Sequence, residues 1–227
     1  ASGAESVGST PAERTMESLE GGRAFAPFLS YLREAEGTMN EKASAAMRQF
    51  LEAMGLDLAA CGMEKTPERV TEMFELLFSG CGKDVSSAWG ELFETKARGL
   101  TAVQHIPFYS LCEHHLVPFF GEAHIAYLPK DGKVAGFGRF VHVVNLLARR
   151  PQLQERFTRE IADAVLDGLS AEGVLVIVEA RQLCMMMRGE LAPGTRTLTS
   201  ETGGTITADA ALGKEAWDLL MRGAKEE

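Results

Sequence analysis

Residues 153–178 read LQERFTREIADAVLDGLSAEGVLVIV, and this stretch joins a helical pattern to a strand pattern. Its first part carries an apolar residue at every fourth position: Leu153, Phe157, Ile161, Val165 and Leu169. This spacing places the five side chains on one face of a helix. Gly173 then interrupts the pattern, and the apolar run at 174–178 predicts a buried strand. The stretch therefore predicts a domain that mixes helices and strands.

Further elements are predicted on both sides of this stretch. Residues 103–108 and 119–128 are rich in β-forming residues and predict two strands. A helix is predicted from about 139 to 149, because Pro151 disfavours helical backbone just before it. Another strand is predicted at 184–188. The order of elements indicates an α+β fold with antiparallel strands and paired helices.

The N-terminal part of the chain has a helical pattern. Residues 24–56 are amphipathic, and Gly55 is expected to end that helix. Thr66 and Pro67 mark the start of a second helix, since proline suits the first helical position. Four apolar residues lie on one face of that helix: Val70, Met73, Phe74 and Leu77. Residues 1–23 are rich in Ser, Gly, Glu and Ala and are expected to form a flexible tail.

The composition excludes several classes of function. The 227 residues carry a net charge of −9, which argues against nucleic acid as a partner. The sequence has no apolar run of about 18 residues and no signal-peptide pattern, so no membrane association is expected. Four cysteines are too few for a disulfide framework in a chain of this length. We expect a cytoplasmic protein, or an organellar one if a targeting segment was removed ahead of Ala1.

The segment CEHH at 112–115 and the distant Cys184 predict a metal site. Two thiols and one of the adjacent imidazoles can bind Zn²⁺ and leave a fourth position open for water. An open zinc site activates that water near neutral pH, so it is a catalytic rather than a structural arrangement. The alternative is two buried structural cysteines beside a packed histidine.

Four segments together resemble GTP cyclohydrolase I: KTPER at 65–69, FYSLCEHHLVP at 108–118, QLQER at 152–156 and CMMMRG at 184–189. The resemblance runs from about residue 40 to 222. It implies a tunnelling fold, in which an antiparallel sheet with two long helices closes with other subunits into an oligomeric barrel, preceded by N-terminal helices. On this basis, 24–100 is the N-terminal helical region and 101–227 the catalytic domain.

The resemblance also implies the reaction and the partners. GTP and water would give 7,8-dihydroneopterin triphosphate and formate, the first step toward folate or tetrahydrobiopterin. The chain would form a homodecamer with active sites at subunit boundaries, and a regulatory protein is a further candidate partner. By motif position, the zinc ligands would be Cys112, His115 and Cys184.

The remaining site residues also follow from the resemblance. His114 would donate or accept a proton beside the metal, or orient a ligand by a hydrogen bond. Glu155 would accept hydrogen bonds from the guanine base, with Gln154 assisting. Arg139 and Arg188 would bind the triphosphate.

The sequence departs from the family's pattern in three respects. Gln182 stands where the family has a second catalytic histidine, and glutamine cannot transfer a proton at neutral pH. The segment GFGR at 136–139 replaces Gly-Leu-Ser-Lys, which removes a hydroxyl and puts Arg139 in place of lysine. His142 stands where a phosphate-binding arginine is common, and it carries less positive charge at pH 7.

These departures leave several hypotheses open. The leading one is a working enzyme in which His142, His105 or water covers the missing histidine. A divergent paralogue would stop at a formamidopyrimidine intermediate, and one half of a tandem protein would need its partner copy. A silent nucleotide-binding or regulatory subunit would bind zinc without turnover. The related nitrile-reducing enzymes of queuosine synthesis use a nucleophilic cysteine without zinc, and the set of Cys112, His115 and Cys184 argues against that hypothesis.

Overall fold

The computed structural model describes residues 40–96, 98–187, 192 and 194–222. The chain divides into two units, with unit 1 ending at Leu76 and unit 2 beginning at Leu77. The functional boundary predicted at residue 100 differs from this division and remains a prediction. The predicted tail at 1–23 and the first part of the predicted helix at 24–56 lie outside the described residues. Among the described helices, none is both long enough and apolar enough to cross a membrane.

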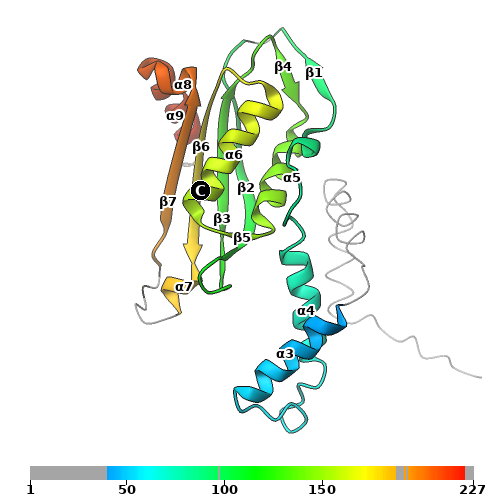
Figure 1. Cartoon of the computed structure of the whole chain (residues 1–227). Coiled ribbons are helices and arrows are strands. Elements are labelled where there is room, and N and C mark those ends of the chain that lie inside the picture. The colour runs from blue at the N-terminus through cyan, green and yellow to red at the C-terminus, as the bar shows by residue number, and fades with distance from the viewer. Residues whose placement is uncertain (1–39, 97, 188–191, 193, 223–227) are drawn as a thin grey trace, which may run out of the picture. The chain divides into compact units, whose positions relative to one another are not determined.

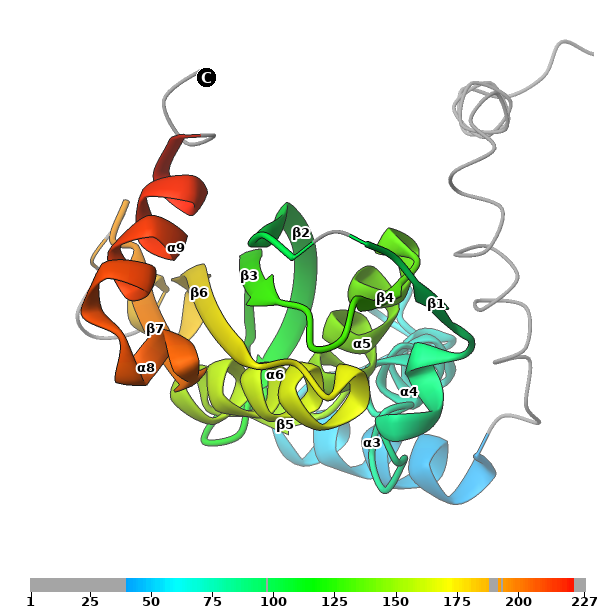
Figure 2. The same cartoon turned by 90° about the horizontal axis from the view of Figure 1, so that it is seen from above.

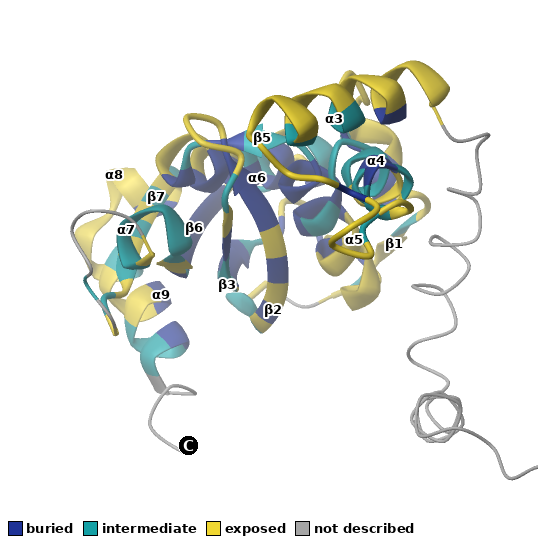
Figure 3. Ribbon diagram, turned by 90° about the horizontal axis from the view of Figure 1, so that it is seen from below, coloured by how far each residue is buried: buried dark blue, intermediate teal, exposed yellow. Residues whose placement is uncertain are grey.

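Unit 1 is built on two helices, α3 (Glu41–Ala53) and α4 (Thr66–Leu77), the second of which ends at the unit boundary. The Asn40 side chain accepts a hydrogen bond from the first turn of α3 and so caps it. Gly55 follows the helix with φ +87°, a backbone conformation that glycine adopts at little cost. Arg48 and Glu68 form an ion pair between the two helices at 3.5 Å. Most of α3 is exposed (Figure 3).

Unit 2 contains a five-stranded sheet in the order β5-β2-β3-β6-β7 (Figure 1). The strands are β2 (Thr101–Cys112), β3 (Pro118–Leu128), β5 (Pro151–Gln152), β6 (Gly173–Gln182) and β7 (Thr197–Gly204). Neighbouring strands are antiparallel except β5, which runs parallel to the end of β2. A separate two-stranded sheet joins β1 (Leu92–Glu94) to β4 (Lys133–Ala135).

Helices cover both faces of the large sheet (Figure 2). Two long helices and one turn of 3₁₀-helix pack on the first face: α5 (Phe137–Ala148), α6 (Gln154–Leu169) and η1 (Ser86–Trp89). Two helices pack on the second face: the single-turn α8 (Thr205–Ala208) and α9 (Ala210–Arg222). The core under α5 and α6 is the larger one, and the ring of Phe157 on α6 lies 4.8 Å from the ring of Phe108 on β2. Between His105 and Ser110, the β2 residues that face α5 and α6 are buried and alternate with exposed residues on the opposite face (Figure 3).

Most of the predicted elements of unit 2 are confirmed. The strands predicted at 103–108, 119–128 and 174–178 correspond to β2, β3 and β6, and the two predicted helices correspond to α5 and α6. The α+β class, with an antiparallel sheet and two long helices, is therefore confirmed. The assignments of β7, α8 and α9 had no counterpart in the sequence analysis.

The strand predicted at 184–188 is wrong where the structure describes it. Leu183–Met186 form α7, one helical turn in which Met187 donates its backbone N–H to the Leu183 carbonyl at 3.0 Å. Leucine and methionine are among the better helix formers, so the intrinsic propensity of this segment favours a helical turn over a strand. The turn follows directly from the end of β6 and changes the direction of the chain there. Arg188 lies outside the described residues.

Candidate metal and nucleotide site

The segment at 112–117 forms a tight turn between β2 and β3. The carbonyl of Cys112 accepts backbone hydrogen bonds from Leu116 at 2.8 Å and His115 at 3.3 Å, and the Cys112 N–H donates to Val117 at 3.0 Å. Leu116 has φ +52°, a conformation that is uncommon for a non-glycine residue. The turn holds the two histidines next to the end of β2, and both side chains are exposed.

The turn and α7 bring together the three residues for which zinc binding was predicted. One ligand atom from each of Cys112, His115 and Cys184 lies within 4.8 Å of the other two. Cys112 is buried and Cys184 is half-buried. Figure 1 shows the end of β2 beside β5 and the start of α7 at the same end of the sheet. The helical turn of α7, which the sequence analysis missed, is thus what carries Cys184 into this cluster.

The chemistry of the three side chains fits a zinc ion. Burial raises the pKa of the Cys184 thiol, and the neighbouring Cys112 raises this pKa further, because two thiolates side by side repel each other. A divalent cation between them removes that repulsion and stabilises both thiolates. Two sulfurs and one imidazole nitrogen are ordinary zinc ligands and leave a fourth position open.

His114 lies beside this cluster without belonging to it. Its Nδ1 is 3.8 Å from Sγ of Cys112, and its ring centroid is 6.0 Å from that of His115. An exposed imidazole at this distance can exchange a proton with a bound molecule or donate a hydrogen bond to a ligand sulfur. Both roles that we predicted for His114 are compatible with this position.

Two side chains link the metal turn to the start of α6. Glu113 donates its backbone N–H to the Gln152 carbonyl at 3.1 Å, and its carboxylate is paired with the Arg156 guanidinium. The Gln152 amide donates to Glu160 at 2.7 Å and to Leu147 at 3.1 Å. Neither Arg156 nor Glu113 was assigned a role in the site from the sequence. Glu113 belongs to the CEHH segment and Arg156 to the QLQER segment. The opposite charges of these two residues were the only indication in the sequence that the two segments contact each other.

Gln154 is buried at the start of α6, and both the nitrogen and the oxygen of its amide are hydrogen-bonded within the protein. Its Nε2 donates to the carbonyls of Val178 and Thr197 at 3.1 and 3.0 Å, and its Oε1 accepts from Thr197 Oγ1 at 2.6 Å. Gln182 Nε2 also donates to Oε1 of Gln154, at 2.8 Å. Gln154 therefore orients Gln182, which in turn lies beside Cys184, with Sγ 3.9 Å from Gln182 Oε1.

Glu155 has different surroundings from its neighbour Gln154. It lies in the first turn of α6 with its side chain exposed, where the positive end of the helix dipole favours a carboxylate. Because Gln152 and Glu113 tie this turn to the CEHH segment, Glu155 lies on the same end of the domain as the three metal-ligand candidates. An exposed carboxylate here can accept two hydrogen bonds from one edge of a planar base.

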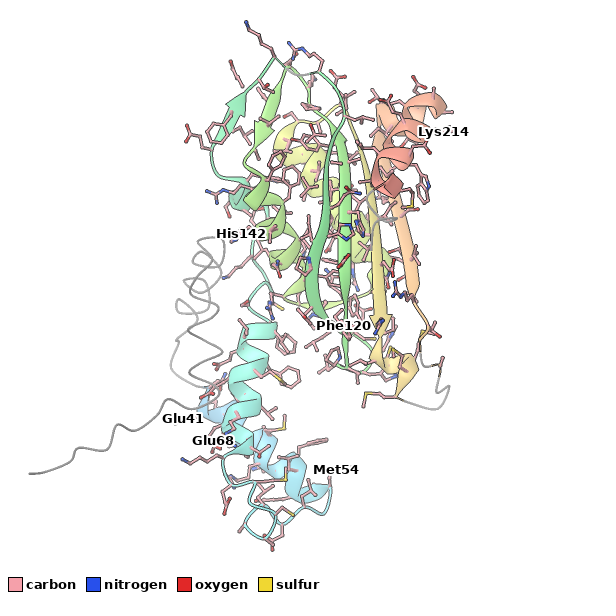
Figure 4. The ribbon with its side chains drawn as sticks, turned by 180° about the vertical axis from the view of Figure 1, so that it is seen from behind. Glu41, Met54, Glu68, Phe120, His142 and Lys214 are labelled. Atoms are coloured by element: carbon pink, nitrogen blue, oxygen red, sulfur yellow. The ribbon has the colours of Figure 1, made fainter. Side chains whose placement is uncertain are left out.

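Of the residues predicted to bind phosphate, the two that the structure describes do not lie at this cluster within one chain. Arg139 and His142 are exposed on the first turns of α5. The end of α5 at Ala148 is the one near the metal turn, and Arg139 lies about 13 Å from Ala148 along the helix axis. Its guanidinium packs against Gly90, where an added Cβ would lie 2.8 Å from the guanidinium carbon. Partial burial of the imidazole and, second, the nearby Arg139 lower the pKa of His142. Figure 4 shows His142 well away from Phe120 on β3.

Comparisons with known proteins identify the family. Residues 43–221 match the family described as GTP cyclohydrolase I. A GTP cyclohydrolase 1 from Halalkalibacterium halodurans is 46% identical over 181 residues, covering 80% of this chain and 96% of that protein. Its counterpart from Clostridioides difficile is 48% identical, covering 79% and 95%, and that from Carboxydothermus hydrogenoformans is 44% identical, covering 79% and 94%. The chain therefore belongs to the GTP cyclohydrolase I family of enzymes.

Proposed function

We propose that this chain hydrolyses GTP to 7,8-dihydroneopterin triphosphate and formate, with Zn²⁺ held by Cys112, His115 and Cys184. The observation that carries this proposal is the approach of three zinc-type ligand atoms to within 4.8 Å at the end of β2. The relatives from three organisms, each named GTP cyclohydrolase 1, support the substrate and the reaction. The product would enter folate or tetrahydrobiopterin synthesis.

The side chains around the cluster would divide the work of opening the imidazole ring of guanine at C8. When bound, Zn²⁺ supplies an activated water near neutral pH. His114 would transfer a proton to the ring nitrogen that leaves C8, since its Nδ1 lies next to Cys112. Glu155 would hold the base by accepting from N1–H and the 2-amino group. Gln154 would act indirectly, by fixing the amide of Gln182.

The triphosphate-binding residues suggest that a second copy of the chain completes the site. Arg139 and His142 lie on the opposite half of α5 from the metal turn, and the family resemblance assigns them, with Arg188, to the phosphates. Within the described residues, β5 pairs with only Leu111 and Cys112 of β2, so the rest of β2 has a free edge on that side. The outer edge of β7 is likewise unpaired in the described part of the chain. Free edges favour sheet pairing between copies, which supports a homo-oligomer, and we propose a decamer.

Gln182 supports a second candidate function, in which the reaction stops at a formamidopyrimidine intermediate. Its amide is held by Gln154 and cannot carry a proton in place of the missing histidine. Mass spectrometry of the products from GTP, with formate assayed in parallel, separates the two functions. Dihydroneopterin triphosphate with formate supports the full reaction. A formamide product without formate supports the second candidate, and unchanged GTP contradicts both.

Replacing Gln182 with histidine is expected to raise the rate of formate release at least about tenfold, if proton transfer at this position limits the rate. The imidazole would occupy the position between Gln154 and Cys184 and could still bond to the Gln154 amide. The measurement is kcat for formate release as a function of pH. Arg181→His is the matched control, because adjacent strand residues point to opposite faces of the sheet. An unchanged kcat in Gln182→His would mean that another group already transfers this proton.

A further inference from the structure

An irregularity in β2 turns two consecutive side chains to the same face of the sheet. The register between β2 and β3 shifts between Val103 and Ile106. Both of these side chains pack in the core under α5 and α6, although regular alternation would pair position 103 with position 105 on that face. The extra residue is a β-bulge. Gln104 and His105 therefore both face α9, and the Gln104 amide donates to the Leu220 carbonyl at 2.7 Å.

The bulge brings His105 to two titratable side chains of β3. Its Nδ1 is 2.7 Å from Oε2 of Glu122, and Nε2 of His124 is 4.0 Å from the same oxygen. The two imidazole rings meet edge to face, with centroids 4.9 Å apart. One ligand atom of each residue lies within 4.8 Å of the other two. His105 has φ +54°, an uncommon conformation whose presence next to such a group suggests a functional use.

The protonation of this cluster suits a metal ion. The His124 side chain is only 12% exposed, and burial first and His105 second lower the pKa of His124. A lowered pKa favours the neutral imidazole, which has a lone pair to donate to a metal ion. The His105 backbone N–H donates to Nδ1 of His124 at 3.3 Å, which is long for such a bond. If Nε2 of His124 bound a cation, the ring proton would move to Nδ1. Only the long hydrogen bond from the His105 N–H would then be lost.

The cluster opens into a hollow of about 530 Å³ on the α9 side of the sheet. Tyr109 and Phe120 stack at 5.9 Å in its wall, and Figure 4 shows this side with Phe120 labelled. Arg181 and Arg196 also line the hollow, and Arg196 is paired with Glu179 at 2.5 Å. Three side-chain ligands at its base would leave the remaining coordination positions facing this space, where water or a small anion fits.

We propose that His105, Glu122 and His124 form a second metal site, which binds a divalent transition-metal ion such as Zn²⁺. Two imidazoles and one carboxylate match zinc and iron sites with open positions, whereas Mg²⁺ and Ca²⁺ prefer oxygen ligands. This site is distinct from the thiolate site. Cys112 packs in the core under α5 and α6, and the second site lies on the opposite face of the same sheet.

In the test, the full chain is first stripped of metal by chelation and dialysed under reducing conditions. Zn²⁺ is then added back, and the bound equivalents per chain are counted. Wild-type protein is expected to bind two equivalents of Zn²⁺, and Cys112→Ala/Cys184→Ala is expected to keep one. Adding His124→Ala or Glu122→Gln to that background should remove the remaining equivalent, because two ligands do not hold a zinc ion firmly. Glu179→Gln is the matched control, since it alters a carboxylate in the same hollow that lies outside the cluster.

Cobalt substitution provides a second measurement that needs no cysteine variant. In wild-type protein one equivalent of Co²⁺ should give an intense thiolate charge-transfer absorption, and a second equivalent should give only weak d–d bands. His124→Ala should abolish the second set of bands and leave the first intact. A single equivalent in wild-type protein, or a second equivalent that survives both His124→Ala and Glu122→Gln, would overturn the proposal. Neither readout depends on turnover of GTP, so failure of the proposed function gives a different result.

Discussion

Replacing Cys184 with alanine is expected to remove the zinc held by the thiolates and to lower kcat for formate release at least about a thousandfold. Cys112 and His115 would be left as a two-residue set, which is too small to hold a zinc ion firmly. Loss of metal-assisted water activation removes several kcal/mol of transition-state stabilisation, and about 4 kcal/mol corresponds to a thousandfold change in rate. The measurements are metal content per chain and a formate assay, both under reducing conditions.

Cys61→Ala is the control for this experiment, because Cys61 is exposed in unit 1 and does not belong to the cluster. It should retain the wild-type metal content and rate. In cobalt-substituted protein, the charge-transfer absorption should disappear in Cys184→Ala and persist in Cys61→Ala. If Cys184→Ala kept the full metal content and this absorption, Cys184 would not be a ligand.

Replacing Glu155 with alanine is expected to weaken GTP binding by about 2–3 kcal/mol, which corresponds to roughly 30- to 150-fold in Kd. The two donors on the guanine edge would lose a charged acceptor, and the first turn of α6 offers no other carboxylate. Binding is best measured in Cys184→Ala protein, in which turnover does not interfere. The same comparison with inosine triphosphate isolates the contact, since that nucleotide lacks the 2-amino group.

Wild-type protein should prefer GTP over inosine triphosphate, and Glu155→Ala should lose most of that preference. Asp163→Asn is the matched control, because Asp163 is an exposed carboxylate on the same helix whose ion pair with Arg159 contributes little. It should leave both affinities unchanged. A preference for GTP that survived in Glu155→Ala would assign guanine recognition to another residue.

Local patterns were sufficient for the regular elements of unit 2. The four-residue spacing from Leu153 to Leu169 predicted α6. Phe157, Ile161, Val165 and Leu169 are buried on a single face of this helix, and Leu153 is its N-cap residue. The apolar run after Gly173 predicted β6 for the related reason that both faces of that strand are covered. The same patterns did not predict α7, because the four residues Leu183–Met186 are too few to show a helical period, although leucine and methionine are good helix formers.

Local patterns also indicated candidate metal ligands, but they did not predict which of these residues lie close together in the fold. Cys112 and His115 share one turn, but Cys184 reaches them only through the antiparallel pairing of β3 with β6 and the turn at α7. The meeting of His105, Glu122 and His124 depends on a bulge in β2, which no periodicity in the sequence indicates. Residue types and spacing therefore predict helices, strands and the chemistry available, since these depend on near neighbours along the chain. Which side chains share a site depends on strand register, where a shift of one residue moves every side chain to the opposite face.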